Sequence, residues 1–210
     1  MKAVVFVDVQ NDFVKGGALA YGYPAESNTD KLIAFARECR AKGYVLYATQ
    51  DTHYETRTQD PCQSENGSYG YLHTLEGKML PVEHCIKGTK GHEVVDGLHR
   101  DEAGDVVIPY GRMIEKETFG SFDLIEKIDD DFAPEGEDVD YGNSGEPLDE
   151  IILCGYCTSI CVVSNALLLR ASRPNTKITV RADLCGDIDE ESHNAALKVM
   201  RNCQIEIANG

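Results

Sequence analysis

The sequence predicts an α/β fold, a three-layer sandwich in which helices cover both faces of a mostly parallel central sheet. Residues 2–9 (KAVVFVDV) and 150–156 (EIILCGY) are apolar along almost their whole length instead of at alternate positions, which is typical of strands buried on both faces. Segments with helical periodicity lie between such strands, and this alternation indicates a parallel sheet. The 210 residues suit a single domain that covers residues 1–210.

The other elements are predicted from their patterns and end signals. A helix is expected from Asn28 to Lys42, because Leu32 and Cys39 share one face and Gly43 can end it. The remaining strands are expected at 44–49, in a short segment ending near Lys116, at 177–183 and at 203–207, and the remaining helices at 158–172 and 187–202.

Two segments lack such a pattern. Residues 51–100 are irregular and rich in His, Gly, Pro and Thr, and an irregular segment of this length inside a compact domain more often builds a site than fills space. Residues 129–150 are acidic and contain Pro and Gly, so we expect a solvated loop there.

Charge and hydropathy exclude several classes of partner. The net charge of -16 leaves no basic stripe for nucleic acid, and we expect no nucleic-acid partner. No apolar run approaches the length of a membrane span, and Asp8 interrupts the first apolar run too early for a signal peptide. We therefore expect a cytoplasmic protein without membrane contact, whose eight cysteines stay reduced.

Three reactive side chains follow strands of the predicted sheet. In such a sheet, ligands bind beyond the carboxyl ends of the strands, where Asp8, Lys116 and Cys161 are expected. A carboxylate at the end of a buried strand needs a partner, and Lys116 is a candidate for Asp8. Cys161 falls in the first turn of a predicted helix, whose free N–H groups favour a thiolate. A carboxylate, an ammonium group and a thiol in one pocket suit acyl transfer to sulfur.

The stretch LCGYCTSICVVSN (153–165) allows other interpretations of its cysteines. Most buried cysteines only pack, and Cys154 is interpreted as a core residue of the strand. Cys154 and Cys157 form a C-x-x-C pair, but a redox pair opens its helix with the first cysteine, whereas Cys154 lies inside the strand. A zinc knot needs a second pair at matching spacing, and the sequence has none.

A second constellation combines Asp51 and His53, after the second strand, with His84. An Asp-x-His pair with a distant His can bind zinc, iron or manganese with positions left open. Loop histidines are often only solvated, so both interpretations stay open for these three residues.

Six ordered blocks resemble the isochorismatase-like cysteine hydrolases, a superfamily of Rossmann-like α/β proteins that includes nicotinamidases. They are VVFVDVQNDFVKGGAL (4–19), ATQDTH (48–53), LPVEHCIKGTKGHEV (80–94), IEKETFGSF (114–122), LCGYCTSICVVSNAL (153–167) and DEESHNAAL (189–197). The resemblance covers nearly the whole chain.

The resemblance implies a catalytic triad of Asp8, Lys116 and Cys161. Cys161, deprotonated by Asp8, is expected to attack the carbonyl carbon of a small amide, and Asp8 to return the proton to the leaving ammonia before water hydrolyses the thioester. Lys116 is expected to hold the thiolate and Asp8 in their charged forms.

Further site residues are implied in the same way. The backbone N–H groups of Cys157 and Cys161 are expected to form an oxyanion hole, with a cis peptide between Tyr156 and Cys157. Gln10 and Phe13 match positions that line the pocket in the family. The resemblance also implies one divalent metal held by Asp51, His53 and His84, and a homo-oligomer, since family members usually self-associate.

The chain departs from the nicotinamidase pattern at several positions. Arg57 stands where a further metal-binding His is usual, so the expected metal site has one protein ligand fewer. Pro81 replaces an aromatic residue that stacks on the pyridine ring, and Ser159 and Ile160 replace the usual residues of Thr-Asp-x-Cys before Cys161.

The leading expectation is an amidohydrolase that releases ammonia from a small-molecule amide, with nicotinamide the first substrate to try. The alternatives are hydrolysis of a ureide or carbamoyl compound, an isochorismatase-type reaction on a vinyl ether, and a non-catalytic member that binds or regulates.

Overall fold

The computed structural model describes residues 1–54, 82–132 and 148–210. The strands are β1 (Lys2–Val7), β2 (Val45–Asp51), β3 (Met113–Lys116), β4 (Glu150–Tyr156), β5 (Lys177–Gly186) and β6 (Glu206–Ala208). The helices are α1 (Thr29–Ala41), α2 (Phe122–Asp131), α3 (Val163–Ser172) and α4 (Glu190–Asn202), with a 3₁₀ turn at Tyr110–Arg112 and a π-helical turn at Thr158–Val162.

The six strands form one parallel sheet in the order β3-β2-β1-β4-β5-β6, so the predicted fold class is confirmed. β1 lies in the middle, between β2 and β4, and its residues are buried from Ala3 onward. The sheet grows in two directions from β1, because β2 and β3 lie on one side of it and β4 to β6 on the other. The carboxyl ends of β1 and β4 therefore meet at the position where ligands bind in sheets of this kind.

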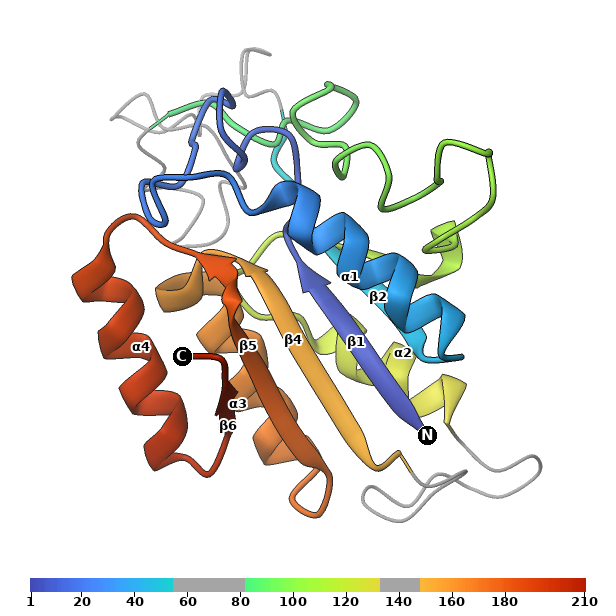
Figure 1. The fold of residues 1–210 in the computed structure, drawn as a ribbon, viewed down its shortest axis with the longest axis vertical. Coiled ribbons are helices and arrows are strands. Elements are labelled where there is room, and N and C mark those ends of the chain that lie inside the picture. Colours follow the sequence, from blue (N-terminus) through green and yellow to red (C-terminus); the bar gives the residue numbers. More distant parts are fainter. Residues whose placement is uncertain (55–81, 133–147) are drawn as a thin grey trace, which may run out of the picture.

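Helices cover both faces of the sheet (Figure 1). On one face, α2, α3 and α4 pack against alternate residues of β1, Ala3, Val5 and Val7. On the other face, α1 and the segment 94–108 pack against the residues between them, Val4 and Phe6. Apolar residues on both faces explain why the strand sequences do not alternate.

The sequence-based prediction of elements is wrong in several places, among them the last strand, which begins at Glu206 instead of residue 203. α2 was not predicted, and the expected loop at 129–150 instead begins inside this helix and ends in β4, with residues 133–147 outside the described part. β5 extends to Gly186, beyond the expected end at residue 183. α4 begins at Glu190 instead of residue 187, because the Asp189 carboxylate accepts from the Ser192 N–H (2.7 Å) and caps the helix.

Gly155 allows β4 to pass close to β1 beside the site. Its φ of +120° lies in the region that favours glycine, and a Cβ atom there would lie 2.1 Å from the carbonyl oxygen of Val7. A side chain at this position would therefore push apart β1 and β4, the two strands that lead into Asp8 and into the turn after Tyr156.

Among the described residues, no helix is long and apolar enough to cross a membrane.

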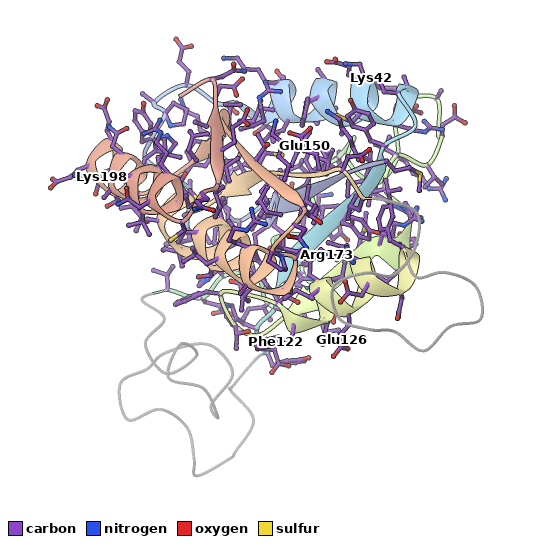
Figure 2. All side chains as sticks on the ribbon, turned by 90° about the horizontal axis from the view of Figure 1, so that it is seen from below. Lys42, Phe122, Glu126, Glu150, Arg173 and Lys198 are labelled. Atoms are coloured by element: carbon purple, nitrogen blue, oxygen red, sulfur yellow. The ribbon has the colours of Figure 1, made fainter. Side chains whose placement is uncertain are left out.

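Glu150 is buried at the end of the sheet where the strands begin (Figure 2). Its carboxylate accepts from Thr179 Oγ1 at 2.7 Å and pairs with Lys2 Nζ at 2.5 Å and Lys177 Nζ at 3.2 Å. Burial raises the pKa of Glu150, but these three partners outweigh it and hold the pKa below its ordinary value.

We expect Glu150→Gln to lower the free energy of unfolding by about 1 kcal/mol at pH 7. Because the pKa of Glu150 is lower in the folded than in the unfolded state, its contribution is present above the ordinary Glu pKa and is lost as pH falls. The difference between variant and parent in urea unfolding should therefore shrink as the pH falls from about 5 to about 3. Glu38→Gln removes only an exposed ion pair, so it should leave both the free energy of unfolding and its dependence on pH unchanged. An equal deficit at all pH values would contradict this assignment.

Candidate active site

Asp8 follows β1 and is completely buried. Its φ of +49° is unusual for a residue with a side chain, although aspartate tolerates it better than most. Thr49, in the neighbouring β2, holds this conformation from both sides: its hydroxyl donates to Asp8 Oδ1 at 2.6 Å and accepts from the Asp8 N–H at 3.1 Å. The carboxylate is thereby fixed at the end of the central strand.

Lys116 is the last residue of β3 and is also buried. β2 lies between β3 and β1, and the long lysine side chain spans this distance. Its Nζ atom lies 2.8 Å from Asp8 Oδ2 and 3.7 Å from Asp51 Oδ1. The pairing of Lys116 with Asp8 that the sequence suggested is therefore present.

Cys161 lies in the π-helical turn that opens α3, so the expected position at a helix start is correct, although this turn is wider than an α-helical one. Its Sγ atom lies 3.5 Å from Lys116 Nζ. Three residues that are far apart in the sequence thus meet in one buried cluster.

The charges in this cluster are tuned by burial and by each other. Burial raises the pKa of the Cys161 thiol well above its ordinary value, although Lys116 opposes the shift. Burial also raises the pKa of Asp8. For Lys116, burial lowers the pKa, but Asp8, Cys161 and Asp51 outweigh it and the pKa lies well above its ordinary value. Lys116 is thus held as a cation, and its charge favours the ionised forms of Cys161 and Asp8 against the effect of burial. That it holds both groups in their charged forms remains a prediction.

The turn between β4 and Cys161 has the backbone form that the resemblance implied. The peptide between Tyr156 and Cys157 is cis. The ring of Tyr156 stacks on that of Tyr21, with centroids 4.5 Å apart, and its hydroxyl donates to Asn28 Oδ1. Cys154 is fully buried in the core, as predicted.

Gln10 lies at the site but is occupied by backbone contacts. Its amide nitrogen donates to the carbonyl oxygens of Asp51 (2.9 Å) and His92 (2.8 Å), and its oxygen accepts from the Asp51 N–H (2.8 Å). These bonds favour a role in positioning Asp51, and a contact of Gln10 with substrate remains a prediction. Phe13 is nearly buried, with its ring 5.5 Å from that of His84, and its contact with substrate likewise remains a prediction.

Asp51, His53 and His84 form a second buried cluster next to Lys116. One candidate ligand atom from each lies within 4.8 Å of the other two. Asp51 Oδ2 lies 2.9 Å from His53 Nε2 and 3.4 Å from His84 Nε2. Burial raises the pKa of Asp51, but Lys116 and the two histidines outweigh it and hold that pKa well below its ordinary value. Arg57 and Pro81, the departures noted in the sequence, lie outside the described residues.

The donor set of this cluster fits a divalent metal. His84 Nδ1 lies 2.8 Å from the carbonyl oxygen of Val82, to which it can only donate. In the neutral ring the other nitrogen then presents a lone pair toward the Asp51 carboxylate, an arrangement that a cation between them would stabilise. Two imidazoles and one carboxylate are ligands that zinc, iron and manganese accept.

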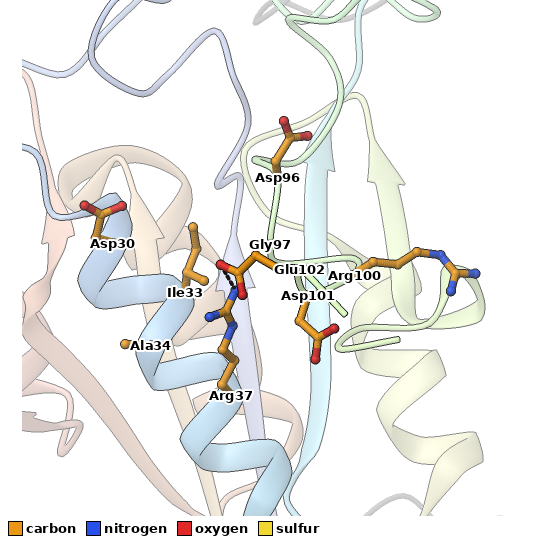
Figure 3. A pocket seen from close by; sticks show the side chains of 9 residues that line it. All are labelled: Asp30, Ile33, Ala34, Arg37, Asp96, Gly97, Arg100, Asp101 and Glu102. Atoms are coloured by element: carbon orange, nitrogen blue, oxygen red, sulfur yellow. Dashed lines mark ion pairs between the residues drawn. The ribbon is translucent and has the colours of Figure 1, made fainter. Parts of the chain in front are cut away.

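Two hollows differ in their relation to these residues. One, of about 480 Å³, is lined by Lys116 together with Thr52, Tyr54 and Phe122. The other, of about 360 Å³, lies between α1 and residues 96–102, and there Arg37 pairs with Glu102 at 2.8 Å (Figure 3). The first adjoins the buried cluster and is the candidate route for a ligand.

Thr49 is a site residue that sequence reasoning missed. It belongs to the strand segment YVLYAT, where a threonine suits a buried strand without any further role. The only signal in the sequence is its place next to the strand end, two residues before Asp51.

The fold and the site together define an α/β protein in which a carboxylate, an ammonium group and a thiol are buried beyond the strand ends, beside a candidate metal cluster. The family model described as Isochorismatase domain matches residues 2–209, so the chain belongs to the isochorismatase family.

Several relatives of this chain are named nicotinamidases. One from Schizosaccharomyces pombe is 29% identical over 218 residues, with 98% of this chain and 91% of the relative covered. The crystal structure of a nicotinamidase from Bacillus subtilis has a TM-score of 0.72 at 22% identity, with 99% of both chains covered. A pyrazinamidase from Pyrococcus horikoshii in complex with zinc has a TM-score of 0.66 at 23% identity, with 100% of this chain and 99% of the other covered. The chain is thus similar over almost its whole length to proteins named nicotinamidases.

Proposed function

We propose that the protein is a cysteine amidohydrolase that releases ammonia from a small-molecule amide through a thioester on Cys161. The observation that carries this proposal is the cluster in which Lys116 Nζ lies 2.8 Å from Asp8 Oδ2 and 3.5 Å from Cys161 Sγ. A base, a cation and a nucleophile within hydrogen-bond reach are the groups that nucleophilic acyl transfer requires.

In the first half-reaction, Cys161 Sγ attacks the amide carbon while its proton passes to Asp8. The raised pKa of Cys161 favours a thiol before attack, and the raised pKa of Asp8 makes this carboxylate a better base. The carbon–nitrogen bond then breaks, Asp8 returns the proton to the leaving nitrogen, and ammonia departs. In the second half-reaction, Asp8 takes a proton from water and the hydroxide adds to the thioester carbon. The carbon–sulfur bond then breaks, Asp8 returns the proton to the leaving sulfur, and the carboxylic acid departs from the restored Cys161 thiol.

The negative oxygen formed in each addition needs hydrogen-bond donors. We propose the backbone N–H groups of Cys157 and Cys161 for this role, since both belong to the turn that follows the cis peptide. Lys116 remains a cation throughout and offsets the negative charge that Asp8 and Cys161 share.

Nicotinamide is the first substrate to test, because the matched relatives are nicotinamidases. The test is incubation with nicotinamide, pyrazinamide, a ureide and unrelated aliphatic amides, with ammonia release and intact mass as readouts. Ammonia release with an acyl adduct on the protein supports the proposal. Absence of both with every amide would refute it and would favour the binding or regulatory alternative, and turnover of a vinyl ether alone would favour an isochorismatase-type reaction.

We further propose that Asp51, His53 and His84 hold one divalent metal, which would act as a Lewis acid that helps to bind and polarise the substrate. The zinc complex of the Pyrococcus horikoshii relative supports this proposal. Within this chain, Gln10 fixes the backbone of Asp51, and the Val82 carbonyl fixes the ring of His84.

We expect the purified protein to contain close to one equivalent of Zn, Fe or Mn by elemental analysis, and Asp51→Asn to contain less than about a tenth of that, because the variant loses the only anionic ligand among the three. His92→Gln is the matched control: His92 is a buried histidine of the same region, bonded to Thr52 Oγ1 at 2.9 Å and outside the cluster. Absence of metal from the parent, or equal metal in Asp51→Asn, would remove this site from the proposal.

The setting that we propose is the cytoplasm, with the protein acting on a small molecule as a homo-oligomer and without a nucleic-acid or membrane partner. The acidic charge and the absence of any membrane-spanning helix among the described residues are compatible with this setting.

A further inference from the structure

Asp187 is a fully buried carboxylate that the proposed reaction does not use. It follows β5, and its backbone is paired with Tyr23 in a short antiparallel bridge, with both N–H···O distances between 2.7 and 2.9 Å. Its side chain points to the turn that carries the nucleophile. Oδ2 accepts from the Ser159 N–H at 2.7 Å, and Oδ1 accepts from the Ser159 hydroxyl and the Ile188 N–H, both at 2.8 Å.

These bonds replace a missing helix cap. The first N–H groups of a helix lack intrahelical partners, and a side chain at the N-cap usually satisfies one of them. Here the N-cap is Cys157, which makes no capping bond with its side chain. Asp187 supplies the cap from another strand, and a carboxylate also complements the positive end of the helix dipole.

The cap acts on the turn that is proposed to bind the oxyanion. Ser159 lies between Cys157 and Cys161, and its neighbour Thr158 is held as well, since Thr158 Oγ1 donates to the carbonyl oxygen of Gly186 at 3.1 Å and accepts from His193 Nδ1 at 2.8 Å. Consecutive residues of the turn are thus tied to the end of β5.

The charge of Asp187 is unfavourable for the chemistry, so its benefit must lie in geometry. In the described part of the chain the partners of the carboxylate are the uncharged donors of Ser159 and Ile188, and its charge raises the pKa of Cys157. A negative charge here also opposes a developing oxyanion nearby.

We infer that Asp187 is a positioning residue, which fixes the 157–161 turn so that the N–H groups of Cys157 and Cys161 meet the oxyanion during acyl transfer. This inference rests on the proposed function for the identity of Cys161 as nucleophile. It predicts that loss of the carboxylate impairs acylation of Cys161 and leaves the reactivity of the thiol itself intact.

The test compares two reactions of one thiol. Acylation by p-nitrophenyl acetate develops an oxyanion, whereas alkylation by iodoacetamide does not, and subtraction of the Cys161→Ala rates removes the contribution of other cysteines. Asp187→Asn keeps the size of the side chain but has one acceptor oxygen for donors on both sides. We expect its acylation rate to fall roughly 10- to 100-fold, as for a reacting group displaced by a fraction of an ångström, and its alkylation rate to stay within about 3-fold.

Two further variants make the result specific. Asp183→Asn, on the same strand, loses an ion pair with Arg181 and should change neither rate. Ser159→Ala loses only the hydroxyl bond and should slow acylation about 3-fold, and it decides the question alone if Asp187→Asn does not fold. Unchanged acylation in Asp187→Asn and Ser159→Ala, or acylation and alkylation falling together in them, would overturn the inference, as would a parent acylated no faster than Cys161→Ala. If the ester acylates Cys161 in an Asp187-dependent way while no amide is turned over, the proposed function fails and the role of Asp187 stands.

Discussion

Cys161→Ala is expected to lower ammonia release from the best amide substrate by at least about 10³-fold, because no other group of the cluster can form the thioester. The fold should survive, since alanine removes one sulfur atom at the edge of the core and Asp8 keeps its bonds to Lys116 and Thr49. The measurements are ammonia release, intact mass after addition of substrate, and the midpoint of thermal unfolding.

Cys157→Ala is the matched control for this prediction. Cys157 lies four residues earlier in the same turn, and only its backbone N–H is assigned a role. It should retain activity within about 3-fold and still form the acyl adduct at Cys161. Ammonia release that survives Cys161→Ala, or that disappears in Cys157→Ala through loss of an adduct at that sulfur, would contradict the assignment of the nucleophile.

The residues of the cluster could be found from the sequence because one rule of parallel sheets places them. Polar residues after buried strands must meet at the carboxyl edge, and this rule alone predicts that Asp8, Lys116 and Cys161 lie together. The strand order then explains the distances, since β2 separates β1 from β3 and only a side chain as long as Lys116 can cross it.

α2 was not predicted because its last turn carries acidic residues, whereas basic residues are usual at the end of a helix. Its apolar residues Leu124 and Ile128 are spaced for one face, and Ser121 caps its start, but acidic residues crowd its last turn, where they oppose the dipole. Tertiary contacts compensate: Asp129 pairs with Arg173, and Asp131 with Arg112 and Lys127. The arginine partners are distant in the sequence, so local patterns could not reveal them.

The role of Asp187 could not be predicted from the sequence for a related reason. An acidic residue just before DEES is typical of the first turn of a helix, and burial against a turn 28 residues earlier has no local signature. Thr49 is hidden in the same way inside an apolar strand. The residues that take part in the proposed reaction were thus predictable from their chemistry, whereas the residues that hold them in place required the fold.

Asp8→Asn is expected to move two rates of Cys161 in opposite directions. Amide hydrolysis should fall roughly 10²- to 10⁴-fold, because an amide side chain can neither take the thiol proton nor return it to the leaving nitrogen. Alkylation of Cys161 by iodoacetamide at pH 7 should become faster. The negative charge of Asp8 raises the pKa of the thiol and Lys116 lowers it, so removal of Asp8 alone lowers that pKa and increases the thiolate fraction.

The pH profile of alkylation shows whether the pKa of the thiol rises or falls in the variant. Its midpoint should shift to lower pH in Asp8→Asn, whereas in the parent burial holds the pKa of the thiol above its ordinary value. Thr49→Val is the graded control, since it keeps the carboxylate and removes the 2.6 Å bond that orients it. We expect about a 10-fold loss of hydrolysis in this variant, with the alkylation midpoint close to that of the parent. Slower alkylation in Asp8→Asn would show that Asp8 is needed to ionise the thiol at rest, and the proton would then leave Cys161 before substrate arrives instead of during the attack.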